Sequence, residues 1–263
     1  MSKSLVFILL LKLGLFSGMI FPVMASDPVN QYDAQGRRQG PWRGYFESGA
    51  LRYEGNFVDN QPVGVFRYYY PQGGLRAELI HEPGEESVKA TYYHRNRAIM
   101  GEGFFLNRQM EGLWRFFSET RVLVGEHFYQ NGLNHGVWKT YYPGGRLAET
   151  QTWHRGKMQG LFERYYMDGS IHIRAHYQDD LLHGKYEVFY PSGRPLLVGY
   201  YTENLSDRVW TWYSERGEIE KKAIYDNGIL VREEIFIETD DEAIPLRPGP
   251  TRNDMPWGTN GMF

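Results

Sequence analysis

Apolar, aromatic and polar residues recur along most of the chain in a pattern that returns every 24 residues. Each repeat starts at position 0, which is Val88 or Arg208 in two repeats and glycine in the other six: Gly40, Gly64, Gly112, Gly136, Gly160 and Gly184. Position 2 is aromatic in seven of the eight repeats, and positions 5 and 17 are aromatic in nearly every copy, with His81 as the exception at position 17. One register kept over eight copies indicates tandem structural units.

Each repeat is expected to form a β-hairpin. In the repeat that begins at Gly136, Pro143 presets a turn, and Gly145 supplies a positive φ where the chain must reverse. A three-residue loop with a bulge would set position 5 opposite position 11, that is, Tyr141 opposite Leu147. A second turn, for example in residues 154–160, connects each hairpin to the next.

The alternation of side chains predicts which residues share a face of the sheet. Positions 5, 11 and 17 are expected together in one aromatic and aliphatic stripe. Rings at positions 2 and 6 then lie on the other face, unless a bulge changes the parity. The predicted fold class is all-β: an elongated, twisted, single antiparallel sheet of consecutive hairpins, with contacts mainly between neighbouring repeats.

The chain divides into four segments: a signal peptide at 1–25, an N-terminal cap and partial repeat at 26–39, eight tandem repeats at 40–231, and a terminal edge strand with a Pro/Gly-rich flexible tail at 232–263. A local distortion or kink is expected at the second and third repeats. There Pro83 and Gly84 replace the usual turn, and Ala90, Arg97 and Arg121 break three of the columns.

The first 25 residues have the character of an export signal. Lys3 precedes an apolar stretch, and Val23-Met24-Ala25 before Ser26 fits cleavage after Ala25. An uncleaved membrane anchor is the alternative, although Lys12 and Pro22 interrupt the span that it would need. The expected location is therefore the periplasm or the cell surface. That the cell is bacterial follows from the resemblance given below and not from the signal sequence.

Composition narrows the chemistry. The chain contains no cysteine, which excludes disulfides, thiolate nucleophiles and cysteine-ligated metals. Its net charge is −3, and it becomes −5 when residues 1–25 are removed, so nucleic acid is not an expected partner and membrane binding is unlikely. His172 and His176 lie four apart on an expected strand but lack a third ligand. No catalytic constellation is present, so we expect no enzyme, no cofactor and no metal site.

One copy of the motif consists of Gly136, Trp138, Tyr141, Tyr142, Gly145, Leu147, Trp153 and Gly156. It resembles the MORN repeat in its bacterial variant form, and the resemblance covers about three-quarters of the chain. The resemblance implies hairpins in an open sheet, a role in protein–protein scaffolding, and dimerisation in some members. Lipid binding has been proposed for other MORN proteins. Bacterial relatives are also described as antitoxin components, which fits an exported chain poorly.

These patterns give a functional hypothesis and two sets of candidate residues. An exposed row of rings is expected to form the interaction surface, with these members: Trp114, Trp138, Tyr142, Tyr166 and Tyr190. Trp257 and Phe263 are candidate anchors of the tail in a partner protein. The leading hypothesis is an exported, non-enzymatic scaffold that binds another envelope protein, with a homodimer left open. The alternative is a module that binds cell-wall glycan through the aromatic ladder.

Overall fold

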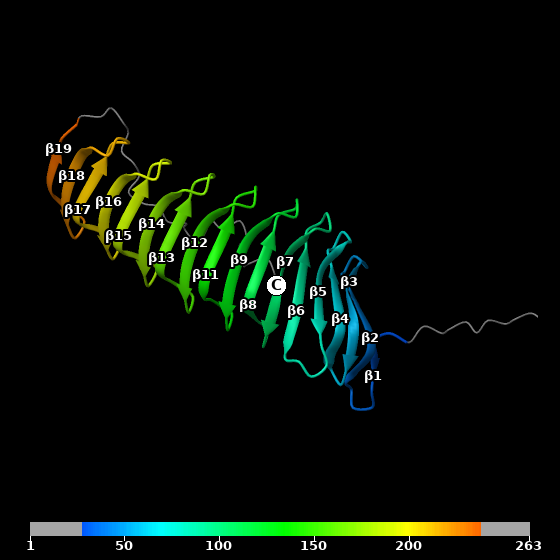
Figure 1. The fold of residues 1–263 in the computed structure, drawn as a ribbon. Coiled ribbons are helices and arrows are strands. Elements are labelled where there is room, and N and C mark those ends of the chain that lie inside the picture. Colours follow the sequence, from blue (N-terminus) through cyan, green and yellow to red (C-terminus); the bar gives the residue numbers. More distant parts are fainter. Residues whose placement is uncertain (1–27, 238–263) are drawn as a thin grey trace, which may run out of the picture.

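A computed structural model describes residues 28–237 as a row of β-strands without a helix. Figure 1 shows the strands side by side along one elongated array, from β1 and β2 at one end to β19 at the other. The signal peptide 1–25 and the candidate anchors Trp257 and Phe263 lie outside the described residues. The strands are β1 (Gln31–Tyr32), β2 (Arg38–Tyr45), β3 (Leu51–Val58), β4 (Gln61–Tyr69), β5 (Leu75–His81), β6 (Ser87–Tyr93), β7 (Ile99–Leu106), β8 (Gln109–Phe117), β9 (Leu123–Gln130), β10 (Leu133–Asn134), β11 (Gly136–Tyr141), β12 (Leu147–His154), β13 (Lys157–Tyr165), β14 (Ile171–Gln178), β15 (Leu181–Phe189), β16 (Pro195–Thr202), β17 (Leu205–Tyr213), β18 (Ile219–Asp226) and β19 (Ile229–Ile235).

Neighbours in the sequence are neighbours in the sheet, and every pairing is antiparallel. The eight repeats supply two strands each, β1 and β19 are added at the ends, and β10 is a short piece separated from β11 at His135. The predicted fold class, a single antiparallel sheet of consecutive hairpins, is confirmed.

The two kinds of turn follow from the residues at their tips. In the long hairpins, position 5 pairs with position 11 as predicted, for example Tyr141 with Leu147. Gly145 has a φ of +79°, and Arg97 and Arg121 adopt the same left-handed conformation, at 68° and 65°, where the column lacks glycine. The connecting turns other than the one at Gly84 have two successive residues with positive φ, such as Asn131 and Gly132, which is the type I′ geometry of tight hairpins.

A β-bulge in the long hairpins decides which residues share a face. The register shifts between positions 4 and 5, for example between Thr140 and Tyr141. One extra residue reverses the alternation, so positions 2 and 17 lie together on one face, and positions 1, 3, 14 and 16 lie on the other. We call these the ring face and the open face. The prediction that position 17 shares a face with position 5 is wrong for this reason.

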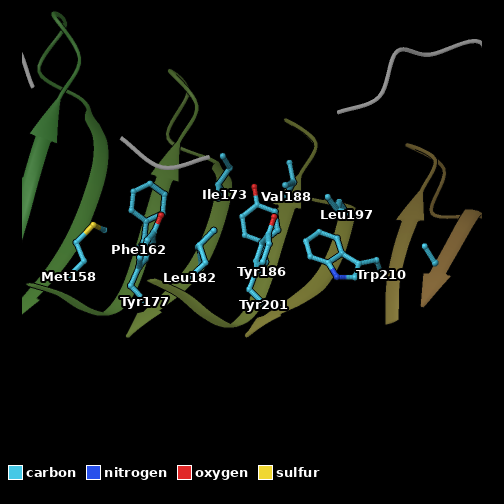
Figure 2. Packing of buried hydrophobic residues seen from close by; sticks show 12 residues of the cluster. Met158, Phe162, Ile173, Tyr177, Leu182, Tyr186, Val188, Leu197, Tyr201 and Trp210 are labelled. Atoms are coloured by element: carbon cyan, nitrogen blue, oxygen red, sulfur yellow. The ribbon is translucent and has the colours of Figure 1, made fainter. Parts of the chain in front are cut away.

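The core of the sheet is a row of aromatic side chains that pack against one another on the ring face. The ring at position 2 meets rings at position 17 of its own repeat and of the preceding repeat. Phe162 and Tyr177 of one repeat have centroids 5.9 Å apart, and Trp138 lies 5.3 Å from Tyr129 of the preceding repeat. Figure 2 shows Phe162, Tyr177, Tyr186, Tyr201 and Trp210 following one another along neighbouring strands. Because a single sheet has no second layer, these rings bury one another.

The strand pairing between the second and third repeats departs from that of the other repeats, as expected. β5 and β6 pair without the register shift that is present in β3–β4, β7–β8, β12–β13, β14–β15 and β16–β17, and Leu79 lies opposite Ala90. In five other repeats the position of Leu79 is occupied by glycine or alanine, and the ring of the next repeat packs over glycines such as Gly103 and Gly199. Here the large side chain, Leu79, stands at the position that is small in most repeats, and Ala90 stands at the position that is otherwise aromatic. The larger volume of Leu79 therefore compensates for the ring that Ala90 lacks.

Candidate interaction surface

Two of the predicted surface residues belong to the core. Trp114 is 0% exposed and Trp138 is 5% exposed. Each indole donates a hydrogen bond to a backbone carbonyl of the preceding repeat: Trp114 to Phe104 at 3.0 Å and Trp138 to Phe128 at 2.9 Å. The prediction that these rings form an exposed surface is wrong, because the bulge places position 2 on the ring face beside position 17.

The three predicted tyrosines at position 6 connect repeats. The hydroxyls of Tyr142, Tyr166 and Tyr190 each donate to the backbone carbonyl at position 5 of the next repeat, at 2.6, 2.8 and 2.9 Å. Their rings are half-buried. The structure therefore places these side chains at the joints between repeats, with their polar ends already engaged.

Exposed apolar side chains gather instead on the open face. Five of them lie on β7, β8, β9, β11 and β13, with exposed fractions between 37% and 50%: Phe104, Leu113, Phe128, Val137 and Leu161. Leu113 and Phe128 are direct cross-strand partners. We call this row the apolar stripe. It crosses the middle of the sheet, and on β15 the same row carries Lys185.

A second row on the open face consists of tyrosine, glutamate and arginine. The Tyr141 hydroxyl donates to Glu126 at 2.7 Å, and the Arg115 guanidinium lies 3.3 Å from the same carboxylate. Partial burial, followed by the bond to Glu126, raises the pKa of Tyr141 to about 12. The same group recurs at Tyr93 and Glu78, so a regular polar row flanks the apolar stripe.

The sequence contained a signal for the apolar stripe that the ring pattern obscured. Position 1 is aliphatic in several repeats, as Leu113, Val137, Leu161 and Val209 show. Its neighbour at position 2 is buried, so alternation alone puts position 1 on the opposite face. An aliphatic column next to a buried aromatic column was therefore the mark of an exposed apolar surface.

The histidines singled out by their spacing do not form a site together. His172 stacks on Tyr166, with centroids 4.3 Å apart, and burial lowers its pKa. His176 is exposed. Within residues 28–237, no group of three histidine, aspartate or glutamate side chains is placed to hold a metal ion. This part of the chain also has no helix of the length and apolar character needed to cross a bilayer.

Comparisons with solved structures give only local likeness. A mutant of S. aureus TarM in complex with fondaparinux, α-GlcNAc-glycerol and UDP matches at 12% identity over 36% of this chain and 19% of the other, with a TM-score of 0.28. The Tc holotoxin pore of Photorhabdus luminescens matches at 10% identity over 71% of this chain and 13% of the other, with a TM-score of 0.19. The matched regions thus span less than a fifth of those chains. A comparison with curated proteins found no match.

A family model described as the MORN repeat variant matches residues 38–59 and 134–154. Both segments coincide with repeat units of the sheet: the first covers β2 and β3, and the second covers β11 and β12. These two segments match the MORN repeat in its variant form, and such repeats support a scaffold for protein interaction.

Proposed function

We propose that this chain is an exported, non-enzymatic scaffold of the bacterial cell envelope that binds another envelope protein along its open face. The observation that carries the proposal is the apolar stripe from Phe104 to Leu161. Scattered apolar residues are normal on a protein surface, but a row of exposed apolar side chains bordered by polar groups is typical of an interaction site, and only Thr152 on β12 interrupts this row between Val137 and Leu161.

The composition of the open face suits a protein partner. Its apolar stripe is bordered by Arg115, Glu126 and Tyr141, and interface rims commonly combine such charged and aromatic residues around an apolar centre. The arginine and glutamate already neutralise each other, so a partner would not have to bury an unpaired charge. Export is supported by the sequence of residues 1–25 alone.

Binding of glycan by an aromatic ladder has less support. Sugar rings stack on exposed aromatic faces, whereas Trp114 and Trp138 are enclosed by neighbouring rings. A glycan would have to use other residues, so the apolar stripe favours a protein partner.

The test combines crosslinking in the native cells with variants of the apolar stripe. The tagged chain is crosslinked, purified from the envelope fraction and analysed by mass spectrometry. The double variant Leu113→Lys with Val137→Lys should lose the partner, because it places two charges in the apolar stripe. Lysine suits this position, since Lys89 and Lys185 occupy it in other repeats.

A matched control removes the same apolar character elsewhere. Val58→Lys with Leu205→Lys changes exposed residues at hairpin ends, away from the apolar stripe, and should retain the partner. The proposal fails if the stripe variant, folded as judged by circular dichroism, keeps the partner. It also fails if the wild-type chain is recovered only in the cytosol, or if purified cell-wall glycan retains the chain while no protein is captured.

A further inference from the structure

Four arginines gather on one long side of the sheet, at the turns of three consecutive hairpins. Figure 1 shows the turns as two rows, one along each long side of the array. The turns that join β4 to β5, β6 to β7 and β8 to β9 belong to the same row, and at or beside their tips they carry Arg76, Arg95, Arg97 and Arg121. Arg76 is half-buried and the other three are exposed. We call these four residues the arginine cluster.

Contacts between neighbouring turns hold the arginine cluster together. The guanidinium of Arg95 lies 3.5 Å from the side-chain oxygen of Gln72 in the preceding turn and 5.6 Å from the centre of the Tyr70 ring. In the other direction, the Asn96 side chain donates to the backbone carbonyl of Glu119 in the following turn at 2.8 Å. Successive long hairpins are two strands apart, so about 10 Å separates these turns and the four positive charges share about 20 Å of the side. Glu119 supplies the one negative charge in turn residues 70–74, 94–98 and 118–122.

The charges of the arginine cluster are not neutralised within the sheet. Arginines at position 3 of the open face pair with glutamates across the strands, as Arg67 does with Glu78 at 2.9 Å. Among residues 28–237, no carboxylate lies within ion-pair distance of the arginine cluster. The whole chain has a net charge of −3, but charges in physiological salt act over only about 8 Å. An approaching anion therefore responds to the local positive charge and not to the net charge.

Two members of the arginine cluster occupy a backbone conformation that favours glycine. Arg97 and Arg121 have φ values of 68° and 65° at position 9, where the other six long hairpins have glycine. This left-handed conformation costs free energy in a residue that carries a Cβ atom. Within residues 28–237, neither side chain forms a hydrogen bond, ion pair or ring contact that would offset the cost. A strained residue without a structural role points to a function for its side chain.

We propose that the arginine cluster binds an acidic segment of a partner polypeptide. A planar guanidinium matches the two oxygens of a carboxylate, which it binds through two parallel N–H···O bonds. Because an extended chain advances about 3.3 Å per residue, a segment of about six residues would span the cluster. A flat anionic surface such as a membrane suits this side of the sheet less well, since other turns of the same row carry acidic residues: Glu47, Asp168, Glu215 and Glu218.

The acidic residues of this chain's own C-terminal segment are too distant to occupy the arginine cluster. From β9 to β19 the sheet extends over about 43 Å, at about 4.8 Å per strand spacing. Residues 238–242 contain four carboxylates, but five residues beyond Ile237 reach at most about 18 Å. The binding partner is therefore a separate molecule.

The arginine cluster is separate from the open-face surface. The apolar stripe lies at positions 1 and 16, beside the connecting turns, whereas the arginine cluster lies at the long-hairpin turns on the other side of the sheet. The proposal is thus independent of the partner that binds along the apolar stripe. Substitutions in one surface leave the other unchanged, so the two proposals succeed or fail separately.

Replacing two arginines of the cluster by glycine tests the proposal. Arg97→Gly with Arg121→Gly removes half of the positive charge and gives both turns the residue found in the other long hairpins. Binding of fluorescein-labelled hexaglutamate, measured by fluorescence anisotropy at low ionic strength, should weaken roughly tenfold through the loss of two charge pairs. The melting temperature, followed by circular dichroism, should rise because the strain is relieved. Arginines with a purely structural role would leave peptide binding unchanged.

A matched control makes the same change in the other row of turns. Arg108 and Arg155 have φ values of 63° and 49°, are exposed, and lie on two separate connecting turns. Arg108→Gly with Arg155→Gly removes the same charge and should keep hexaglutamate binding, while neutral hexaglutamine should not bind the wild-type chain. The proposal is overturned if the wild-type chain does not bind hexaglutamate, or if both double variants weaken binding equally. It is also overturned if heparin or phosphatidylglycerol vesicles bind the arginine cluster in preference to the peptide.

Discussion

Replacing Gly103 by alanine tests how one repeat packs on the next. A Cβ atom at Gly103 would lie 2.4 Å from a ring carbon of Trp114. Nonbonded carbon atoms settle about 3.5–4.0 Å apart, so the indole would have to move by about 1 Å. Trp114 is completely buried, and its ring nitrogen donates to the Phe104 carbonyl at 3.0 Å, so this movement breaks a hydrogen bond and disturbs the rings around it.

The expected loss follows from these two effects. Overpacking a tight core costs about 1–3 kcal/mol, and losing the hydrogen bond costs about 1 kcal/mol. Gly103→Ala should therefore lower the free energy of unfolding by about 2–4 kcal/mol. The control is Gly144→Ala, because no atom lies within 4 Å of a Cβ built there and its φ is outside the left-handed region. That variant should stay within about 0.5 kcal/mol of wild type.

Urea unfolding followed by tryptophan fluorescence and by circular dichroism measures both variants, and coincident curves justify a two-state treatment. A second set of variants tests the reasoning itself. Gly103→Leu with Trp114→Ala reproduces the natural pair Leu79 and Ala90. The double variant should be more stable than the sum of the single losses predicts. Additive losses, or a Gly103→Ala variant as stable as Gly144→Ala, would refute the idea that Gly103 is needed to leave room for the indole ring of Trp114.

Three further predictions concern single residues. His127 is 5% exposed, and burial lowers its pKa to about 3, so it binds a proton below pH 6.5 only in the unfolded chain. Stability should fall as the pH drops from 6.5 towards 3, and wild type should lose about 2–3 kcal/mol more than His127→Leu between pH 7 and pH 4.5 in urea titrations; equal slopes would contradict this. Arg97→Gly should raise the melting temperature, by relieving a φ of 68° worth about 0.5–1 kcal/mol, while Arg95→Gly in the same turn should not. Tyr166→Phe should lower stability by about 1 kcal/mol through loss of the bond to the Phe189 carbonyl, and no change in calorimetry would show that water replaces it.

Much of the architecture follows from sequence spacing. The period of 24 residues, the turn at Gly145 and the pairing of Tyr141 with Leu147 come from local chemistry, and the structure confirms them. Local chemistry acts over a few residues, and a tandem array has almost only local contacts. The fold could therefore be predicted without knowledge of any distant contact.

The faces of the sheet could not be predicted in the same way. One inserted residue, such as the bulge beside Tyr141, exchanges the buried and the exposed side of everything that follows. Trp138 and its neighbour Val137 therefore exchange roles: the tryptophan is enclosed, and the valine is half exposed. The sequence also did not predict that Leu79 compensates for the small side chain of Ala90, because this depends on which residue faces Ala90 across the strands.

One repeat near the middle of the sheet lacks the hydrogen bond by which a tyrosine at position 6 connects it to the next repeat. Ser118 occupies position 6 there, and its hydroxyl bonds within its own turn to Thr120 at 2.8 Å. The break between β10 and β11 falls at the same joint, where Nδ1 of His135 is buried without a hydrogen-bond partner among the described residues. This joint therefore depends on the stacking of His127 on Trp138, with centroids 3.9 Å apart, and on the bond from the Trp138 indole to the Phe128 carbonyl. The apolar stripe crosses the same joint between Phe128 and Val137, so a protein bound along it would hold together two repeats that lack the tyrosine bond.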